Sequence, residues 1–594
     1  MDRLEQASQL FFQALALHEQ GKLDQAKRLY REALALAPDR PSIMSNLATA
    51  YVQSEKYEDA RALCESLLQI EPENEAALVA LAGAFLGLER LDEALACCDR
   101  ALTVNPDSAH AHNNKGSILR ELDRADEALK SFDRALDIEP DFPDALNNRG
   151  NTLQDLDRLE EALAGYRRAL AVKPDYVDAR CNLGNALLRL GDEEEANAAF
   201  GQAIVLRPDD ASCHLRFADA LLVQQCWDEA IAEYEHALRL NPASTDAQYG
   251  LAIVRLFRQE FERAWRGYEC RVGLKSYRRT HLRNYPASLI SYERLVRWQG
   301  PGEPDVHDVA LWAEQGIGDQ VLFSTLIPEL VATRVPIVYE VDSRLLAAYQ
   351  RAYLEVRFVP RQGAPNEALR GTSRVLLAGS LPSLFRRSRP DFARQPAKLL
   401  SALPERVSHY RRRLEAERPQ LKVALSWRSV RSDWWVTRKN AGLADFAPVF
   451  EISGAQFVDV QYGDTLAERS AAETTTGRRL VHFDEVDYFE DLEEVLAVLE
   501  ACDLLITTSN ATAHFAGALG KRTWLLYLAD RAPFHYWAHG GTYRSLWYPS
   551  VEIVSAPHLT DWPALIAHVR RRLVSELTHV RAGSNGPHPA ACRR

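Results

Sequence analysis

The sequence has no apolar stretch near the ~18 residues that a membrane-spanning helix requires. Its opening segment, MDRLEQASQLFFQALALHEQ, carries charges throughout and no uninterrupted apolar core, so we expect no secretory signal there. The nine cysteines are scattered and none forms a Cys-x-x-Cys pair, which argues against a disulfide framework or a zinc site. These absences predict a soluble, cytoplasmic protein that does not insert into membranes.

Positive charge is scarce in the first part of the chain. Residues 1–264 carry 28 Lys and Arg against 47 Asp and Glu, which leaves 43 of the 71 basic and 36 of the 83 acidic residues for the remainder. The acidic part repels nucleic acid, so we expect no nucleic-acid partner. The mildly basic remainder suits an anion such as a sugar nucleotide, although these charges can equally be solvated surface.

A repeat with a period of 34 residues fills residues 1–264. The prolines of the repeat are Pro38, Pro72, Pro106, Pro140, Pro174, Pro208 and Pro242. An alanine precedes each proline by twelve residues, and a second series of small residues runs from Ala48 to Ala252. Each unit predicts two antiparallel helices, in which the small residue of the first lets the alanine of the second approach and the proline ends the second. Stacking of about seven to eight such units builds a superhelix.

The period, the small residues and the proline resemble the tetratricopeptide repeat over about residues 4–270. Four asparagines share one position of the repeat: Asn46, Asn114, Asn148 and Asn182. An amide both donates and accepts hydrogen bonds, so a row of asparagines in the concave groove can bind the backbone of a protein acceptor. The row resembles the asparagine ladder in the repeat domain of eukaryotic O-linked N-acetylglucosamine transferase. Ala80 and Arg216 interrupt it, and the alternative is that asparagine is only tolerated at a solvated helix position.

Beyond residue 264 the period ends and strands alternate with helices. The expected strands are Val309–Trp312, Ile337–Glu340, Arg374–Leu377, Lys422–Ser426, Gln456–Val460, Leu504–Thr507 and Thr523–Leu528. Short apolar runs of this kind, each followed by a turn and an amphipathic helix, predict doubly wound parallel sheets. Ligands bind at the carboxyl ends of the strands in this architecture.

The pattern divides this second part into segments. We expect a connector at 265–305, a first Rossmann-like domain at 306–400, a linker helix at 401–420, a second Rossmann-like domain at 421–565, and a terminal helix with a disordered tail at 566–594. The predicted fold class is therefore an all-α superhelix followed by an α/β pair of Rossmann-like domains. The second of these domains is expected to bind the nucleotide sugar.

A first loop with chemical potential is AEQGIGDQVLF, which follows a strand and opens a helix. Gly316 and Gly318 allow a sharp turn and a close approach of another backbone or a substrate. The third glycine of a dinucleotide fingerprint is missing, so a nicotinamide site is not expected. Asp319, in the first helical turn, could take the proton from an acceptor hydroxyl. Its alternative role is that of a carboxylate suited to the start of a helix.

A second loop follows the strand at 504–507 and also opens a helix. Its candidate donor-binding residues are Thr508, Ser509, Asn510, Ala511, Thr512 and His514. Free N–H groups at a helix start, with hydroxyls and an amide beside them, form a cradle for the phosphate of a nucleotide. The alternatives are an ordinary helix cap and a packed histidine.

Groups near the preceding strand complete the expected donor site. Trp427 and Arg428 follow the strand at 422–426, and Lys439 lies in the loop after it. Cations there could neutralise the leaving phosphate, or they could be surface charges only. The aromatic residues at 534–548 could wall a base or a sugar, or fill the core.

Four segments carry a family resemblance: AEQGIGDQVLF, VALSW, LLITTSNATAHFAGALGK and SLWYPSVEIV. They resemble the catalytic domain of bacterial tetratricopeptide-repeat glycosyltransferases, which is similar to the heptosyltransferases and their GT-B fold. The resemblance covers nearly all of residues 265–560 and implies that Asp319 is the catalytic base and that the stretch from Ser509 to His514 binds the donor. Ser509 stands where the heptosyltransferases have aspartate, which suggests a different sugar or nucleotide.

Within that family the whole chain most resembles the soluble flagellin glycosyltransferases. The resemblance implies transfer of a nonulosonic acid, such as pseudaminic acid, from its CMP-activated form to Ser or Thr of flagellin held by the repeats. The enzyme would be an inverting, metal-independent transferase whose nucleotide sugar is a substrate, with no cofactor; the expected cleft loops contain no Asp-x-Asp motif. Two alternatives remain: a non-catalytic repeat scaffold or flagellin chaperone, and a heptosyltransferase-like enzyme of surface glycans.

Overall fold

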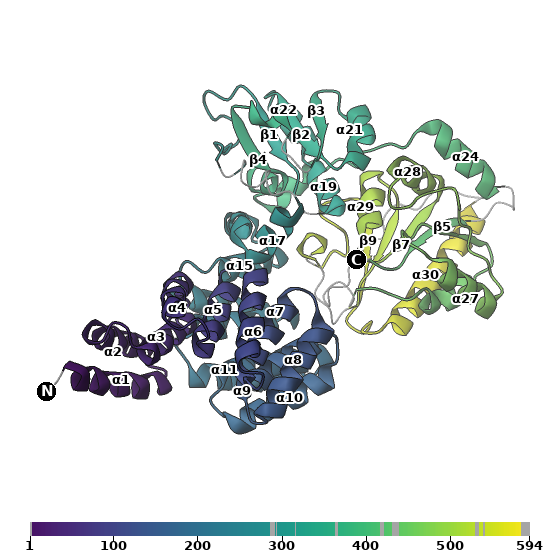
Figure 1. The fold of residues 1–594 in the computed structure, drawn as a ribbon. Helices are drawn as coiled ribbons and strands as arrows, with labels where there is room; N and C mark the ends of the chain where they lie inside the picture. The colour runs from purple at the N-terminus through teal and green to yellow at the C-terminus, as the bar shows by residue number, and fades with distance from the viewer. Residues whose placement is uncertain are drawn as a thin grey trace. The chain divides into compact units, whose positions relative to one another are not determined.

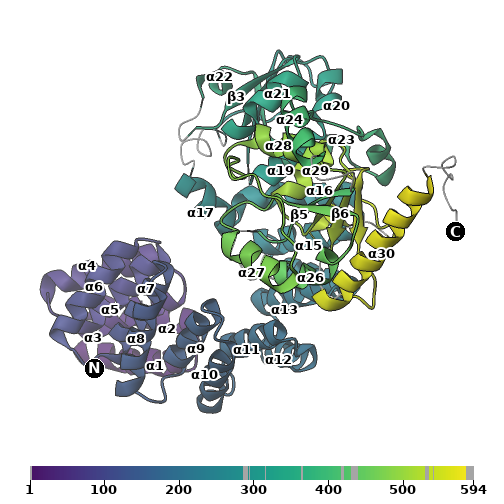
Figure 2. The ribbon, with the colours of Figure 1, turned by 90° about the vertical axis from the view of Figure 1, so that its right-hand side faces the viewer.

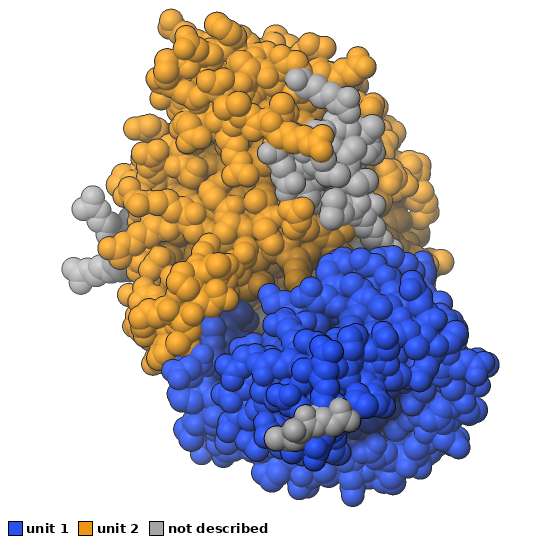
Figure 3. Space-filling model, turned by 60° about the vertical axis from the view of Figure 1, so that its left-hand side comes forward, with its two compact units in different colours: residues 1–220 blue, residues 221–594 orange. Residues whose placement is uncertain are grey.

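The computed structural model describes residues 3–284, 292, 294–314, 316–362, 366–415, 421–429, 439–528, 534–538 and 541–583. The chain forms two compact units, residues 1–220 and 221–594 (Figure 3). The division falls inside one helix of the repeat series, so the last repeats share a unit with the parallel sheets. The tail expected to be disordered lies, from residue 584 on, outside the described residues, as do residues 285–291 of the connector.

Sixteen helices follow one another through residues 3–268, as the repeat predicts (Figure 1). The first helices of the pairs are α1 (Arg3–Glu19), α3 (Pro41–Gln53), α5 (Glu75–Gly87), α7 (Ala109–Glu121), α9 (Pro143–Asp155), α11 (Val177–Leu190), α13 (Ala211–Val223) and α15 (Thr245–Phe257). The second helices are α2 (Leu23–Leu36), α4 (Tyr57–Ile70), α6 (Leu91–Val104), α8 (Ala125–Ile138), α10 (Leu159–Val172), α12 (Glu193–Leu206), α14 (Trp227–Leu240) and α16 (Phe261–Tyr268).

The small residues of the repeat make room for an aromatic ring. A Cβ on Gly116 would lie 2.7 Å from the Phe132 ring, and a Cβ on Gly150 would lie 2.6 Å from Tyr166. The expectation that this position faces the alanine of the second helix is therefore corrected, because its nearest neighbour is the ring four residues after that alanine. The alanine itself, such as Ala128, is fully buried. Each repeat proline lies two residues past the end of a second helix, as Pro106 follows Val104.

The turns inside the repeats contain residues with positive φ, which the sequence does not predict. One residue per turn adopts positive φ, at intervals of 34 residues: Gly21, Glu55, Glu89, Asp123, Asp157, Gly191, Gln225 and Gln259. Most residues disfavour this left-handed region, and only two of these eight are the glycine that suits it. The tight turn between the two helices of each pair imposes the conformation whatever the side chain.

The second part contains two parallel sheets, which confirms the predicted α/β class (Figure 1). The first sheet has the order β3-β2-β1-β4, built from β1 (Val309–Trp312), β2 (Ile337–Val341), β3 (Val356–Pro360) and β4 (Arg374–Leu377). The second has the order β6-β5-β7-β8-β9, built from β5 (Leu421–Ser426), β6 (Ala455–Asp459), β7 (Leu504–Thr507), β8 (Thr523–Leu526) and β9 (Val551–Val554). We call residues 309–394, which contain the first sheet, the first block, and residues 421–583, which contain the second sheet, the second block.

Helices connect and cover the strands of both blocks. Those before and within the first block are η1 (Glu269–Gly273), α17 (Lys275–Asn284), α19 (Ile317–Ser324), α20 (Ile327–Ala332), η2 (Ser343–Leu345), α21 (Leu346–Ala352), α22 (Glu367–Arg370), η3 (Ala378–Ser380), α23 (Leu381–Phe385) and η4 (Arg389–Arg394). Those after it are α24 (Pro404–Glu415), η5 (Leu443–Phe446), α26 (Ala447–Phe450), α27 (Leu466–Thr476), α28 (Leu492–Ala501), α29 (Ala511–Ala518), η6 (His535–Trp537) and α30 (Trp562–Gly583). None of the described helices combines the length and apolarity of a membrane span.

Two strands escaped prediction, and both lie at sheet edges. In β3, Arg357 is exposed between buried residues, and in β9, Glu552 is half-buried between buried residues. An edge strand has one face or flank open to water, so it alternates apolar with polar residues instead of forming a continuous apolar run. The central strands β1 and β7 are buried along their whole length and were predicted with their correct bounds.

Candidate functional site

The two loops singled out in the sequence meet in the structure. The first opens α19, where the Gly316 N–H donates to Asp319 Oδ2 at 3.3 Å. The second opens α29. A Cβ on Gly318 would lie 3.0 Å from His514 Cδ2 and 3.7 Å from the Ala511 Cα, so a side chain there would require the imidazole to shift by a few tenths of an ångström. Asp319 is half-buried and caps its own helix, the alternative role considered above. The close approach expected of Gly318 is thus made by α29.

His514 is a buried, neutral histidine. Its Nδ1 lies 3.1 Å from the Tyr548 hydroxyl, and its ring centroid lies 5.0 Å from that of Trp537 and 5.3 Å from that of Tyr536. Burial lowers the pKa of His514 to about 3, with a smaller contribution from the positive charge of Lys439. The imidazole is therefore uncharged at neutral pH and can act through packing and hydrogen bonding, but not as a cation.

The loop before α29 is held by its own side chains. The Asn510 Oδ1 accepts from the Ala513 N–H at 3.3 Å, which caps the helix, and its Nδ2 donates to Ser426 Oγ at 2.8 Å. The Ser509 hydroxyl accepts from the Trp537 indole N–H at 3.0 Å. Among the described residues, the buried Thr508 hydroxyl has no hydrogen-bond partner. Thr512, in the first turn of α29, is also buried.

Gln461 organises the end of β5, a role that the sequence analysis missed. Its Oε1 accepts from Ser426 Oγ at 3.1 Å, from the Trp427 N–H at 2.9 Å and from the Arg428 N–H at 3.0 Å. Its own N–H donates to the buried Asp459 at 2.8 Å. The signal available in the sequence was position alone, since polar residues just past a parallel strand meet those of the neighbouring strands.

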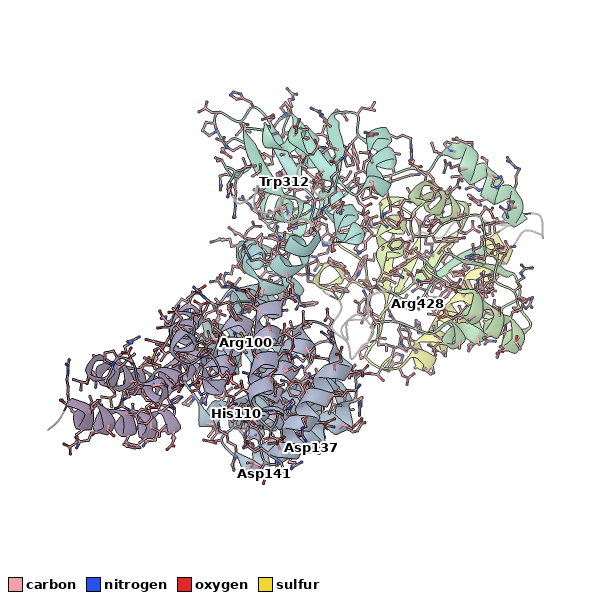
Figure 4. All side chains as sticks on the ribbon, in the orientation of Figure 1. Arg100, His110, Asp137, Asp141, Trp312 and Arg428 are labelled. Atoms are coloured by element: carbon pink, nitrogen blue, oxygen red, sulfur yellow. The ribbon has the colours of Figure 1, made fainter. Side chains whose placement is uncertain are left out.

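The side chains of Trp427 and Arg428 both contact Glu468, and the Arg428 carbonyl oxygen accepts from Asn510 Nδ2 of the α29 loop at 3.4 Å. The Trp427 side chain is fully buried in the core of the second block, and its indole N–H donates to Glu468 at 3.3 Å. Arg428, labelled in Figure 4, forms an ion pair with Glu468 at 3.2 Å and donates to the Asp464 carbonyl oxygen at 2.9 Å. Glu468 lies close enough to compensate part of the charge of Arg428, and a contact of Arg428 with phosphate stays a prediction.

Lys439 is the expected cation that lies near His514. Its ammonium sits 4.4 Å from the centroid of the Phe534 ring, and Phe534 in turn stacks on Tyr536 at 5.2 Å and 4°. The start of α29 adds the partial positive charge of a helix N-terminus. Together with the Thr508 hydroxyl these groups suit an anion, and the Asp319 carboxylate is the acidic group of the facing loop. Within the described ranges, no cluster of three or more His, Cys, Asp or Glu side chains could hold a metal ion.

The asparagine row links neighbouring repeats. Three amides donate to the preceding first helix: Asn114 to the Val79 carbonyl oxygen (3.1 Å), Asn148 to Asn113 Oδ1 (3.1 Å) and Asn182 to Asn147 Oδ1 (2.9 Å). Asn46 instead donates to the Ser42 carbonyl oxygen of its own helix at 2.8 Å. Arg216 continues the row by donating to Asn182 Oδ1 at 3.2 Å. All four asparagines are half-buried, so the row contributes to the stacking of repeats, and its contact with an acceptor stays a prediction.

A buried ionic cluster, also missed in the sequence analysis, lies beside the first loop. Arg271 in η1 and Glu314 after β1 are both fully buried and pair at 2.8 Å. The Tyr277 hydroxyl donates to Glu314 Oε2 at 2.6 Å, and Arg271 Nη2 donates to the Ser380 hydroxyl at 2.9 Å. Nothing in the local sequence marks this pair, because Arg271 lies in a basic stretch that is typical of a surface connector.

Comparison with known proteins places tetratricopeptide repeats in the first part of the chain. Families described as tetratricopeptide repeat or TPR repeat match residues 17–67, 51–118, 116–157, 155–191, 177–210 and 215–266. The chain is 30% identical over 295 residues to Protein FlbA of Caulobacter vibrioides, covering 47% of this chain and 48% of FlbA. The chain thus spans about half the length of the relative that it matches.

Solved repeat proteins are similar to shorter stretches of the chain. TTC0263, a thermophilic TPR protein of Thermus thermophilus, is 27% identical and covers 31% of this chain and 99% of its own, with a TM-score of 0.29. PilW, a type IV pilus biogenesis factor, is 28% identical and covers 35% of this chain and 96% of its own, with a TM-score of 0.30.

Proposed function

We propose that this chain is a protein O-glycosyltransferase with a GT-B catalytic part. It would move a sugar from a nucleotide-activated donor, CMP-pseudaminic acid or a similar nonulosonic acid, to Ser or Thr of a protein acceptor bound by the repeats. The observation that carries the proposal is the contact between the two helix starts, where Gly318 fits against His514. This contact brings a carboxylate, Asp319, toward the loop whose groups suit an anion.

In this proposal the two loops have opposite tasks. Asp319 takes the proton of the acceptor hydroxyl, whose oxygen then attacks the anomeric carbon while the bond from that carbon to the phosphate oxygen breaks. The departing nucleotide takes the electron pair of the broken bond, and Lys439 with the α29 N-terminus stabilises its charge. Neutral His514 packs against the glycine loop and keeps both helix starts at a fixed separation. The transfer inverts the anomeric centre and uses no metal ion.

The repeats and the comparisons support a protein acceptor. Tetratricopeptide repeats cannot bury their faces singly, and stacked arrays present extended concave surfaces that bind protein partners. The similarity to Protein FlbA extends over about half of each chain and does not itself identify an acceptor. Flagellin as the acceptor rests on the resemblance of the whole chain to the soluble flagellin glycosyltransferases.

Calorimetric titration of the full chain with CMP and CMP-activated sugars tests the donor site. We expect binding of CMP by the wild-type chain and weaker binding by the Lys439→Ala variant. Arg572→Ala is the matched control: Arg572 pairs with Glu552 of β9 at 2.6 Å in the same block and is not among the expected donor-binding residues, so this variant should bind CMP as the wild type does. No heat of association with CMP or any sugar nucleotide would contradict the proposal.

One observation favours a second candidate, the non-catalytic scaffold. The pairing of Arg428 with Glu468 compensates part of the positive charge expected at the phosphate site. A scaffold would bind flagellin without binding CMP, so the same titration separates the two functions.

A further inference from the structure

The last repeat is built into the second unit and touches both blocks (Figure 2). The Trp265 indole N–H, on α16, donates to the Arg386 carbonyl oxygen of the first block at 2.7 Å. The rings of Trp265 and Tyr268 lie 6.4 Å and 5.9 Å from the ring of His535 in the second block. The final helix of the repeat series therefore bridges the two sheets rather than ending before them.

The ionic cluster joins this repeat to the loop of Asp319. Arg271, three residues after α16 ends, holds Glu314, and Glu314 lies two residues before the Gly316 that starts α19. The packing leaves no space, because a Cβ on Gly379 would overlap Glu314 Oε1. The Glu314 carboxylate also raises the pKa of Arg271 well above its usual value, although burial acts in the opposite direction.

Stability alone does not explain a buried pair of this kind. Taking two charges out of water is costly, and apolar residues of similar volume often stabilise a core equally well or better. What such a pair supplies is a fixed geometry, since a guanidinium and a carboxylate pair in few orientations. Here the pair holds Glu314 at the start of the loop. The hydrogen bond from the Gly316 N–H, two residues later, then holds the Asp319 carboxylate.

We propose that Arg271 and Glu314 are positioning residues that fix the Asp319 loop to the end of the repeat array. The inference rests on the proposed function for its catalytic meaning. Its physical content is that the terminal repeat and the α19 start move as one body. The position of the Asp319 carboxylate is then set by the terminal repeat, which belongs to the same unit.

Hydrogen exchange and transfer kinetics on the full chain test the proposal together. The variants are Glu314→Gln, which keeps the shape but removes the charge, and Tyr277→Phe, which removes only the 2.6 Å hydrogen bond. Glu303→Gln is the matched control, because it breaks a largely buried pair with Arg374, the first residue of β4, at the end of the first sheet opposite to the Asp319 loop.

We expect faster amide exchange in peptides spanning residues 316–323 for Glu314→Gln, a smaller effect in the same direction for Tyr277→Phe, and none for the control. The kcat for transfer should fall on the order of 100-fold in Glu314→Gln, with the KM for the donor unchanged. If Glu314→Gln does not fold, the amide exchange of residues 316–323 in Tyr277→Phe alone tests the proposal.

Unchanged exchange at residues 316–323, or equal losses in the control, would overturn the proposal. Faster exchange in a chain whose wild type transfers no sugar would leave the coupling standing and remove the proposed function. The exchange experiment thus distinguishes a failure of the proposed coupling from a failure of the proposed transferase function.

Discussion

Gly318 fits against the ring of His514, where an added Cβ would lie 3.0 Å from the His514 Cδ2 atom between the starts of α19 and α29. We predict that Gly318→Ala loses transfer activity by about 100-fold, because the added methyl group separates the two helix starts by a fraction of an ångström or more. It should also destabilise the fold by about 1–3 kcal/mol, as overpacking does. Activity and thermal melting of the purified variant measure both effects.

Gly371→Ala is the control for this substitution. Gly371 has no neighbouring atom within 4 Å of an added Cβ and lies in the first block. Loss of activity in both variants would show that the contact with His514 is not the cause.

Asp319→Asn should reduce the transfer rate by about 100-fold or more, because an amide cannot accept the proton of the acceptor hydroxyl. The fold should stay intact, since the Asn oxygen can still accept from the Gly316 N–H. Initial rates with saturating donor and acceptor measure the change, and circular dichroism checks the fold. Wild-type rates in Asp319→Asn would remove the base assignment.

His514 predicts a pH dependence of stability. Its pKa is lowered to about 3 in the folded chain from 6.5, so the unfolded chain binds a proton that the folded chain does not. The stabilisation is present above about pH 6.5 and is lost as the pH falls toward 3, by about 1.4 kcal/mol per pH unit for one proton. His514→Gln should therefore show a shallower loss of unfolding free energy between pH 6 and 4.

Chemical denaturation at a series of pH values measures this slope for both proteins. His535, whose pKa burial lowers to about 4, contributes in the same direction and is unchanged in the variant. Identical slopes in wild type and variant would contradict the neutral, buried state of His514.

The asparagine row gives a prediction that separates stacking from acceptor binding. Asn182→Ala removes a hydrogen bond between repeats and should cost about 1 kcal/mol of stability. Asn46→Ala removes only a bond within its own helix, so its effect on stability should be smaller. If the row binds the acceptor, both variants weaken flagellin binding in a pull-down or titration; if only Asn182→Ala does so, the row is structural.

The left-handed turns of the repeats predict a gain in stability. Glu89 is exposed and has φ of 59°, a region that costs an L-residue roughly 1–2 kcal/mol and a glycine none. Glu89→Gly should stabilise the chain by about 0.5 kcal/mol after the added entropy of the unfolded glycine is subtracted. Gly191→Ala, at φ 89° in the equivalent turn, should destabilise it. A loss of stability in Glu89→Gly would contradict this account.

The sequence predicted what depends on regular spacing or on continuous burial. The helix pairs follow from a 34-residue period, and β1, β4 and β7 follow from short apolar runs with the correct bounds. The Asp319 and His514 loops each follow the carboxyl end of a parallel strand, as expected, but β1 and β7 belong to different sheets, so the meeting of the loops also requires the two blocks to face each other. The edge strands β3 and β9 contain Arg357 and Glu552 and lack a continuous apolar run, which is why they were missed.

Contacts between distant residues could not be predicted from one sequence. Arg271 and Glu314 are 43 residues apart and belong to different elements, so neither residue type nor spacing announces their pairing. Arg428 is a second case: it was expected to face phosphate, and nothing near it in the sequence predicts its pairing with Glu468, forty residues later. In both cases tertiary packing determines which residue pairs with the arginine, and the local sequence does not predict that packing.

The central claim, sugar transfer to a protein hydroxyl, is tested most directly by the intact mass of flagellin after incubation with the full chain and a CMP-activated nonulosonic acid. The account predicts that the mass of flagellin rises by one or more sugar residues. Flagellin of unchanged mass, under conditions where the chain binds both flagellin and the donor, would contradict it.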